Sequence, residues 1–326
     1  MKELQLREAL REAMQEEMRR DERVFLMGEE VAEYNGAYKV SQGMLEEFGP
    51  KRVIDTPIAE LGFSGIGIGA AMMGLRPIVE FMTWNFSLVA IDQIVNNAAK
   101  MLQMSGGQYS VPIVFRGASQ SAGQLAATHS QSFESFYGNI PGLKVVSIAT
   151  PADGKGLSQT AIRDPNPVLV MESEQMYGMK GLVPEDDDFI IPLGKADVKR
   201  EGSDVTIMTY GKMYHTVVEA ADALAKDGVS VEIVDIRSIR PLDEETLLNS
   251  VKKTNRCVVV DEAPPRYSVA SEIAYVLQRH AFDYLDAPVV KVNGRDTPMA
   301  YSGVMVDYFL PSVERIVQAV NHVMYR

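Results

Sequence analysis

The sequence predicts an α/β protein of two domains, each built from a parallel sheet with helices on both faces, that is, three layers. Short apolar runs such as 24–27, 143–148 and 168–171 alternate with longer segments of helical periodicity. This alternation is typical of parallel sheets that are covered on both faces. The chain has 326 residues, of which 46% are hydrophobic and 23% charged. That is enough for two globular domains of ordinary size.

The first series of elements begins with an amphipathic helix. Leu6, Leu10, Met14 and Met18 recur every four residues and form one apolar stripe. Residues 60–74 are rich in Gly and Ala, which suits a helix that another backbone approaches closely. A long helix is expected over 88–104, ending at the glycine pair 106–107. Further strands are expected at 51–54, 77–81 and 112–115, a Gly/Ser/Ala/Gln-rich loop at 117–130, and a helix at 152–164.

A change of composition marks the boundary between the domains. Segment 174–194 contains glycines, prolines and the acidic run 185–188, which we expect to be a solvated loop. The alternation then restarts, with strands at 204–210, 231–236, 257–260 and 288–292 and helices at 213–227, 243–253, 268–280 and 312–324. We therefore expect a first domain over 1–180, a linker over 181–200 and a second domain over 201–326.

Composition excludes several classes of protein. The net charge of −12 argues against non-specific nucleic-acid binding, which needs a basic surface. No apolar run has the length of a membrane span, and the acidic N-terminus resembles neither a signal nor a transit peptide. We expect a cytoplasmic protein. Cys257 is the single cysteine, so intrachain disulfides and thiolate metal clusters are excluded; it reads as a small core residue.

Common nucleotide and zinc motifs are absent. There is no phosphate-binding loop of the Gly-x-x-x-x-Gly-Lys-Ser/Thr type. Gly65 and Gly67 lie within a predicted helix and not at a strand-to-helix turn, so they do not form a dinucleotide fingerprint. With four histidines and no His-Glu-x-x-His, a dedicated zinc site is not expected.

Two residues have the features of catalytic groups. Glu60 follows a strand-to-helix turn and has apolar flanks, which could raise the pKa of its carboxyl and let it share a proton with a ligand nitrogen. The alternative is a first-turn acid that the helix dipole favours. His129 lies in a polar loop expected at the carboxyl end of a strand, where open α/β sheets bind ligands. The alternative is an exposed loop histidine.

Several ordered segments together resemble a known family: the beta subunit of the decarboxylating component of 2-oxo acid dehydrogenase complexes. The resemblance covers nearly the whole chain. The segments that carry it are 25–31 (FLMGEEV), 55–60 (DTPIAE), 69–77 (GAAMMGLRP), 104–107 (MSGG), 129–131 (HSQ), 141–146 (PGLKVV) and 161–164 (AIRD).

The resemblance implies a transketolase-like fold, with a pyrimidine-binding domain followed by a C-terminal domain. Glu60 matches the glutamate that binds the aminopyrimidine ring of thiamine diphosphate and promotes loss of the thiazolium proton. Phe86 matches the aromatic residue packed on that ring, although it could instead be a core phenylalanine. Glu29 matches a second acid near the cofactor and could equally be a solvated loop acid. His129 matches a histidine that assists acyl transfer to a lipoyl group.

A potassium ion is also implied by the resemblance, held mainly by backbone carbonyls. The matching positions are Ile113, Ala161, Ile162, Asp164 and Asn166. Oxygen ligands of this kind suit a hard cation. From the residues alone, 164–167 is simply a turn.

The chain departs from the family pattern at three places. Thr128 stands where the family usually has Gln, the loop 116–120 lacks the usual proline and glycines, and 261–266 replaces a glycine-rich run. The Gly-Asp-Gly segment that holds the cofactor diphosphate through Mg²⁺ is also missing. The resemblance therefore implies an alpha subunit that supplies this half of the site in an α2β2 heterotetramer. A dihydrolipoyl acyltransferase core would then dock on the C-terminal domain near Asp286.

The expected substrate is a small 2-oxo acid. Segment 80–86 (EFMTWNF) looks closer to pyruvate-type chains than to branched-chain ones, so pyruvate is favoured over a branched-chain 2-oxo acid or acetoin. Two other classes remain open. A non-catalytic docking subunit would not need both Glu60 and His129, and a stand-alone transketolase-like enzyme would need the missing Gly-Asp-Gly.

Overall fold

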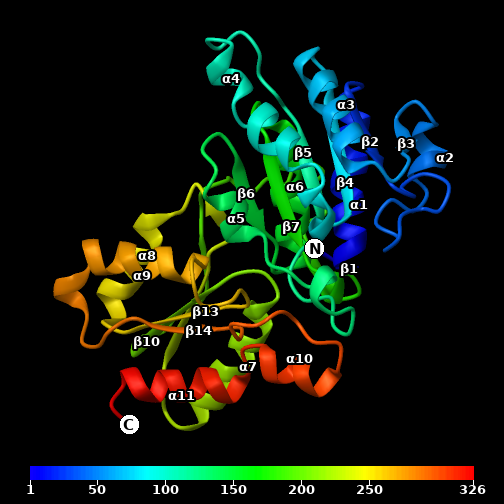
Figure 1. Ribbon diagram of the computed structural model, residues 1–326. Helices are drawn as coiled ribbons and strands as arrows, with labels where there is room; N and C mark the ends of the chain where they lie inside the picture. The colour runs from blue at the N-terminus through cyan, green and yellow to red at the C-terminus, as the bar shows by residue number, and fades with distance from the viewer. The chain divides into compact units, whose positions relative to one another are not determined.

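The computed structural model describes residues 1–326, which form two compact units. The first unit comprises residues 1–119 and 136–193, and the second comprises 120–135 and 194–326. Figure 1 labels the elements of both. No helix is both long and apolar enough to cross a membrane.

The first unit is built on a parallel sheet, as the sequence predicts. Neighbouring strands lie in the order β6-β7-β5-β4-β2-β3, and each pair runs parallel. Every residue of β2, β5 and β7 is buried, which explains their continuous apolar character. The strands are β2 (Val24–Gly28), β3 (Val53–Asp55), β4 (Arg76–Thr83), β5 (Val114–Ala118), β6 (Lys144–Ser147) and β7 (Val168–Glu172).

Helices cover both faces of this sheet. The predicted stripe on α1 (Leu6–Arg20) is confirmed, because its four apolar residues lie in one core with Leu157 and Ala161 of α6 (Pro151–Arg163). On the other face Phe63 of α3 (Glu60–Met72) contacts Phe81, which stacks on Phe115 at 5.8 Å between ring centroids. Other elements of this part of the chain are β1 (Lys2–Gln5), β8 (Lys180–Val183), α2 (Met44–Phe48), α5 (Glu134–Gly138) and η4 (Glu174–Met176).

The predicted continuous helix over 88–104 is wrong. The chain instead forms the 3₁₀ helix η1 (Trp84–Leu88), the π-helix η2 (Gln93–Ala98) and the short helix α4 (Met101–Met104). The π turn lies where η2 packs closely on α3, since a Cβ added at Gly65 would lie only 3.3 Å from the Gln93 side chain. The predicted glycine terminus is confirmed: Gly107 has φ +86° and its N–H donates to the Leu102 carbonyl at 2.8 Å.

The second unit has a five-stranded sheet in the order β14-β13-β10-β11-β9. Helices α7 and α11 share one core with the sheet, and α8 and α9 share the core on its other face, so the three predicted layers are present (Figure 1). The strands are β9 (Asp197–Arg200), β10 (Val205–Thr209), β11 (Val231–Asp235), β13 (Cys257–Asp261) and β14 (Val290–Asn293). The helices are α7 (Met213–Lys226), α8 (Glu244–Thr254), α9 (Val269–His280), α10 (Gly303–Phe309) and α11 (Val313–Val323). Shorter pieces are β12 (Ser238–Arg240), η3 (Ala127–His129) and η5 (Phe282–Tyr284).

The segment expected as a linker contains regular structure. Its end forms β9, which pairs antiparallel with β11, whereas all other strand pairs within that sheet are parallel. Its beginning belongs to β8, which pairs antiparallel with β1. Cys257 is fully buried in β13, as expected of a core residue.

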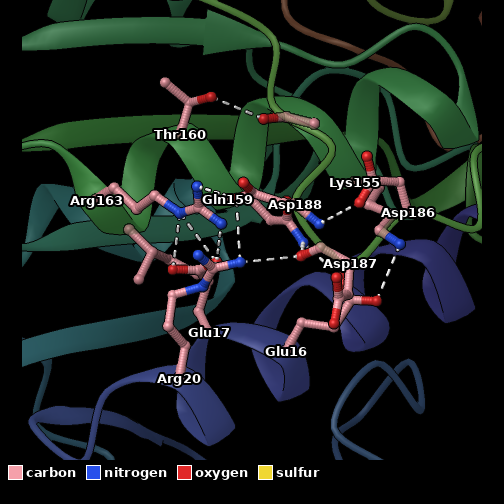
Figure 2. A network of polar contacts seen from close by, with 12 residues as sticks. Glu16, Glu17, Arg20, Lys155, Gln159, Thr160, Arg163, Asp186, Asp187 and Asp188 are labelled. Carbon is pink, nitrogen blue, oxygen red and sulfur yellow. Dashed lines mark hydrogen bonds and ion pairs between the residues drawn. The ribbon is translucent and has the colours of Figure 1, made fainter.

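The acidic run 185–188 is an exposed loop, as expected, and it also contacts two helices of the first unit. Arg163 of α6 donates to the Asp188 carboxylate at 2.6 Å, and Arg20 of α1 forms an ion pair with it at 3.0 Å. The Asp187 carbonyl accepts from Gln159 at 3.1 Å. Figure 2 shows these side chains converging from the two helices on the run. The run therefore tethers the chain after β8 to α1 and α6.

Candidate active site

The ends of three neighbouring strands form the candidate site. β3, β2 and β4 are parallel, with Gly28 paired to both Asp55 and Glu80, so their carboxyl ends lie at one edge. Glu29 directly follows β2, and Thr56 directly follows β3, with its N–H bonded to the Gly28 carbonyl at 2.9 Å. Phe86 follows β4 within η1. This edge is where open α/β sheets bind ligands.

Glu60 is the first residue of α3 and is 6% exposed. Pro57 disfavours helical conformation at Thr56, and Ala59 is still non-helical, with φ −156° and ψ 67°. The preceding turn therefore ends at Ala59, and the first helical side chain is a carboxylate held inside the protein. Glu60 is buried, but the apolar flanks that led to this prediction are largely exposed themselves, with Ile58 at 83% and Leu61 at 47% exposure.

Glu29 is buried to the same degree and lies beside Glu60. Burial, together with charge repulsion from the nearby Glu60 carboxylate and a hydrogen bond with it, raises the pKa of Glu29 to about 7. The Oε1 atom of Glu29 has no hydrogen-bond partner. Two acids this close cannot both ionise cheaply, so the pair holds a proton near neutral pH. Glu29 is therefore not a solvated loop acid.

Two buried hydroxyls near these acids in the sequence also have no hydrogen-bond partner: Thr56 Oγ1 and Ser64 Oγ. Ser64 is four residues after Glu60 on α3, so both side chains lie on one face of the helix. Buried polar atoms are nearly always paired. Unpaired donors and acceptors beside a carboxylic acid fit a polar heteroaromatic ring. Sequence reasoning missed Ser64, although its spacing from Glu60 was a usable signal.

Phe86 is half-buried in η1. The neighbouring aromatic residues have core roles: Trp84 is fully buried, and its indole N–H donates to the Val170 carbonyl at 3.2 Å. The Thr83 hydroxyl accepts from the Asn85 N–H at 3.0 Å and fixes the start of η1. The contacts of Trp84 and Thr83 therefore fix the position of the turn that carries Phe86.

His129 lies in the second unit, at the end of η3. The ring is half-buried, and its Nδ1 lies 3.0 Å from the hydroxyl of Thr128, the residue that departs from the family pattern. The loop closes through a bond from the Gln120 N–H to the Gln131 carbonyl at 2.9 Å. His129 is therefore part of an ordered turn.

A buried ion pair anchors the His129 loop within its unit. Lys212 and Glu262 form this pair at 3.0 Å, and they are 7% and 2% exposed. The Glu262 carboxylate accepts from the Ser121 N–H at 2.5 Å, while Lys212 donates to the Ser121 carbonyl at 3.0 Å. Glu262 belongs to the segment that replaces the family's glycine-rich run. The substituted residue therefore has a structural role in holding the loop.

The predicted potassium ligands lie at the opposite, amino-terminal edge of the first sheet, since Ile113 precedes β5 and Asp164 and Asn166 precede β7. Arg76 donates to the Ile162 and Asp164 carbonyls, each at 3.0 Å. The Ala161 and Ile113 carbonyls accept from backbone N–H groups of Asp164 and Val168. A carbonyl has two lone pairs, so the oxygen type fits a cation, with Arg76 as a competing positive charge.

A second buried cluster joins β4, β5 and β7. Arg116 pairs with both Glu80 and Glu172, and Tyr177 donates to Glu172 at 2.7 Å. Burial raises the pKa of Glu80. The sequence placed Arg116 in a loop, but it lies in β5 with 3% exposure. A charged residue this deep is tolerated because its two carboxylate partners come from the adjacent strands.

The comparisons with known proteins agree with this architecture. The transketolase pyrimidine-binding domain model matches residues 2–180, and the transketolase C-terminal domain model matches residues 194–316. Curated relatives named "Pyruvate dehydrogenase E1 component subunit beta" include one from Rhizobium meliloti, 55% identical over 98% of this chain and 70% of that protein. Another, from Rickettsia felis, is 52% identical over 98% of both chains. The chain belongs to this family of beta subunits.

The family extends to eukaryotes, and the fold is shared more widely. The mitochondrial beta subunit of Bos taurus is 51% identical over 97% of this chain and 89% of that protein. A solved structure titled "Split gene transketolase, inactive beta4 tetramer" superimposes with a TM-score of 0.81 over 99% of both chains at 22% identity. That likeness confirms the predicted transketolase-like fold.

Proposed function

We propose that this chain supplies the aminopyrimidine half of a thiamine diphosphate site in the decarboxylating component of a pyruvate dehydrogenase complex. The observation that carries the proposal is the buried pair Glu29 and Glu60 at the carboxyl edge of the first sheet. The names and full-length similarity of the relatives support the choice of pyruvate as substrate.

The residues of this chain have separate roles in the proposed site. Glu60 would hold a proton against a ring nitrogen, and Glu29 would keep one carboxyl of the pair protonated near neutral pH. Phe86 would pack on the ring, and the hydroxyls of Thr56 and Ser64 would bond its polar atoms. Thiamine diphosphate, when bound, supplies the electron sink for decarboxylation of a 2-oxo acid. His129 would assist acyl transfer to a lipoyl group.

An alpha subunit would complete the site. The chain has no Gly-Asp-Gly segment to hold Mg²⁺ and the diphosphate. α3 exposes several large apolar side chains along the helix that begins with Glu60, including Leu61 at 47% and Ile66 at 66% exposure. A Cβ at Gly69 would meet nothing within 4 Å. Exposed apolar and small residues of this kind support a subunit interface, and we propose an α2β2 heterotetramer.

The decisive experiment is reconstitution of the chain with an alpha subunit, with and without Glu60→Gln. We expect Glu60→Gln to assemble and bind thiamine diphosphate but to lose about 10²- to 10⁴-fold in pyruvate decarboxylation, as for removal of a general acid–base group. Glu46→Gln is the matched control, since Glu46 is an exposed first-turn acid of α2. Unchanged decarboxylation in Glu60→Gln would contradict the proposal and favour a docking subunit.

Two further parts of the proposal have their own measurements. Assays on pyruvate, 3-methyl-2-oxobutanoate and acetoin test the substrate, and preference for the branched acid would overturn the pyruvate assignment. A melting temperature higher in KCl than in NaCl at equal ionic strength would support potassium. Docking of the acyltransferase core near Asp286, and a cytoplasmic location, remain predictions.

A further inference from the structure

A cavity of about 260 Å³ opens in the second unit, at the end of β14 and the start of α11. Arg295 and Asp296 line one side, Lys291 and Asn293 come from β14, and Arg315 comes from the first turn of α11. This volume is slightly below the roughly 300 Å³ at which pockets for drug-sized ligands begin. It suits a ligand of a few heavy atoms.

The cavity carries an excess of positive charge. Lys291, Arg295 and Arg315 line it, and Asp296 is the single carboxylate among the lining residues. Asp296 forms an ion pair with Arg266, which lies outside the cavity, at 3.3 Å. The lining side chains therefore have a net charge of +2.

The three cations are held in place by neutral groups. Lys291 donates to the Pro265 carbonyl and the Ser271 hydroxyl, each at 2.7 Å. Arg315 donates to the Leu310 carbonyl at 3.1 Å and the Asn293 carbonyl at 2.6 Å. The Arg295 guanidinium bonds the Tyr308 carbonyl at 3.3 Å and lies over the Tyr308 ring. These contacts orient the cations without neutralising them.

The arrangement has an electrostatic cost that an anion would relieve. Burial lowers the pKa of Arg315, and the charge of Arg295 lowers it further. Two guanidinium groups that repel each other in a partly buried site bind an anion more strongly than isolated surface cations do.

The wall of the cavity also contains an unsatisfied acceptor. Asn293 is 4% exposed, and its Oδ1 has no hydrogen-bond partner. The amide orientation is fixed, because Nδ2 donates to the Ala263 carbonyl at 3.0 Å and the Ser268 hydroxyl at 3.3 Å. Buried acceptors are nearly always paired, and a ligand hydroxyl is the kind of donor that would satisfy this one.

We propose that this cavity binds a small phosphate monoester. A phosphate monoester has a charge of about −1.5 to −2 at neutral pH, which matches the +2 of the lining. Its oxygens can accept from two guanidinium groups and one ammonium at once. The site is separate from the Glu29–Glu60 pair, which lies in the other unit, and its existence does not depend on the proposed catalytic function.

The test is calorimetric titration of the full chain with glycerol 3-phosphate, with glycerol and inorganic phosphate as comparison ligands. We expect saturable binding of glycerol 3-phosphate, weaker binding of phosphate and none of glycerol. Arg295→Gln should weaken binding at least about tenfold, the effect of losing one charge-assisted hydrogen bond. Asp296→Asn should tighten it, because it removes the one negative charge of the lining.

Arg279→Gln is the matched control, since Arg279 is an exposed arginine of α9 outside the cavity and its loss changes the net charge equally. We expect it to bind like the unaltered chain. Absence of saturation up to about 10 mM ligand, where binding free energy is only a few kcal/mol, would overturn the proposal. So would equal weakening in Arg295→Gln and Arg279→Gln. Because Asp296 is exposed, Asp296→Asn is expected to fold, and unchanged affinity in it would count against the site even if Arg295→Gln failed to fold.

Discussion

The carboxyl group of Glu29 lies against that of Glu60, and both side chains are 6% exposed. Burial, followed by the charge of Glu60, raises the pKa of Glu29 from 4.5 to about 7. The two carboxyl groups, one after the end of β2 and one at the start of α3, therefore retain a proton near neutral pH. This arrangement costs stability, because an acid that is hard to ionise would ionise freely in the unfolded chain.

Glu29→Gln is expected to stabilise the free chain at pH 8. Between pH 4.5 and about 7 the folded state binds more protons at Glu29 than the unfolded state, so its contribution to stability falls as the pH rises through this window. At pH 8 the free energy of unfolding of the Glu29→Gln variant should be higher by on the order of 1–2 kcal/mol. Between pH 5 and 7 its free energy of unfolding should depend less on pH. Urea unfolding at several pH values measures both. Glu33→Gln, an exposed acid of the same loop, should show neither effect.

Ser64→Ala is expected to separate stability from ligand binding. Ser64 Oγ is buried without a partner, so its removal should leave the stability of the free chain unchanged or raise it by up to about 1 kcal/mol. With the alpha subunit and thiamine diphosphate present, the same variant should gain less stability from the ligand than the unaltered chain does. Thermal melts with and without the cofactor test this. An equal gain in both proteins would mean that this hydroxyl does not contact the ligand.

Sequence periodicity predicted most of the fold because most helices and strands here have one buried face or are wholly buried. It failed at η2, where the backbone widens into a π turn against Gly65 of α3. Such a turn depends on the packing of two helices and leaves no periodic signal. β9 was missed for a similar reason: its four residues are all only half-buried, so alternation is weak.

The candidate site was predictable only in part. Glu60 could be found because its flanks are apolar, and the resemblance identified Glu29. The proximity of the Glu29 and Glu60 side chains depends on β2 and β3 ending at the same edge of the sheet, which no local sequence pattern reveals. Likewise, Arg116 looked like a loop residue because its partners Glu80 and Glu172 are 36 and 56 residues away in the chain. Only the sheet order brings these charges into contact.

Lys155→Met is expected to destabilise the first unit strongly. The Lys155 side chain is fully buried in α6 and donates to Glu12 at 2.7 Å and Glu16 at 2.9 Å, the latter contact visible in Figure 2. Removing it leaves two carboxylates facing each other, a loss of about 3–5 kcal/mol for a broken buried pair. Lys2→Met is the control: Lys2 also pairs with Glu12, but is 41% exposed, so it should lose no more than about 1 kcal/mol. Urea unfolding compares the two, and equal losses would contradict a special role for the buried lysine.

The Lys212–Glu262 pair is expected to control the order of the His129 loop. Glu262→Gln leaves Lys212 buried without its carboxylate and weakens the hold on the Ser121 N–H, so residues 120–131 should open more often. Hydrogen exchange of these amides should rise by about tenfold or more, while exchange in β10 and β13 stays nearly unchanged. Adding Lys212→Met removes the buried positive charge that no longer faces a carboxylate at position 262, and the double variant should recover part of the lost global stability. It should not recover the slow loop exchange, because both contacts to Ser121 are then altered.

In the reconstituted enzyme, a loosened loop should lower acyl transfer more than decarboxylation if His129 acts at that later step. An equal fall in both rates would show that the pair stabilises the unit as a whole and does not position His129.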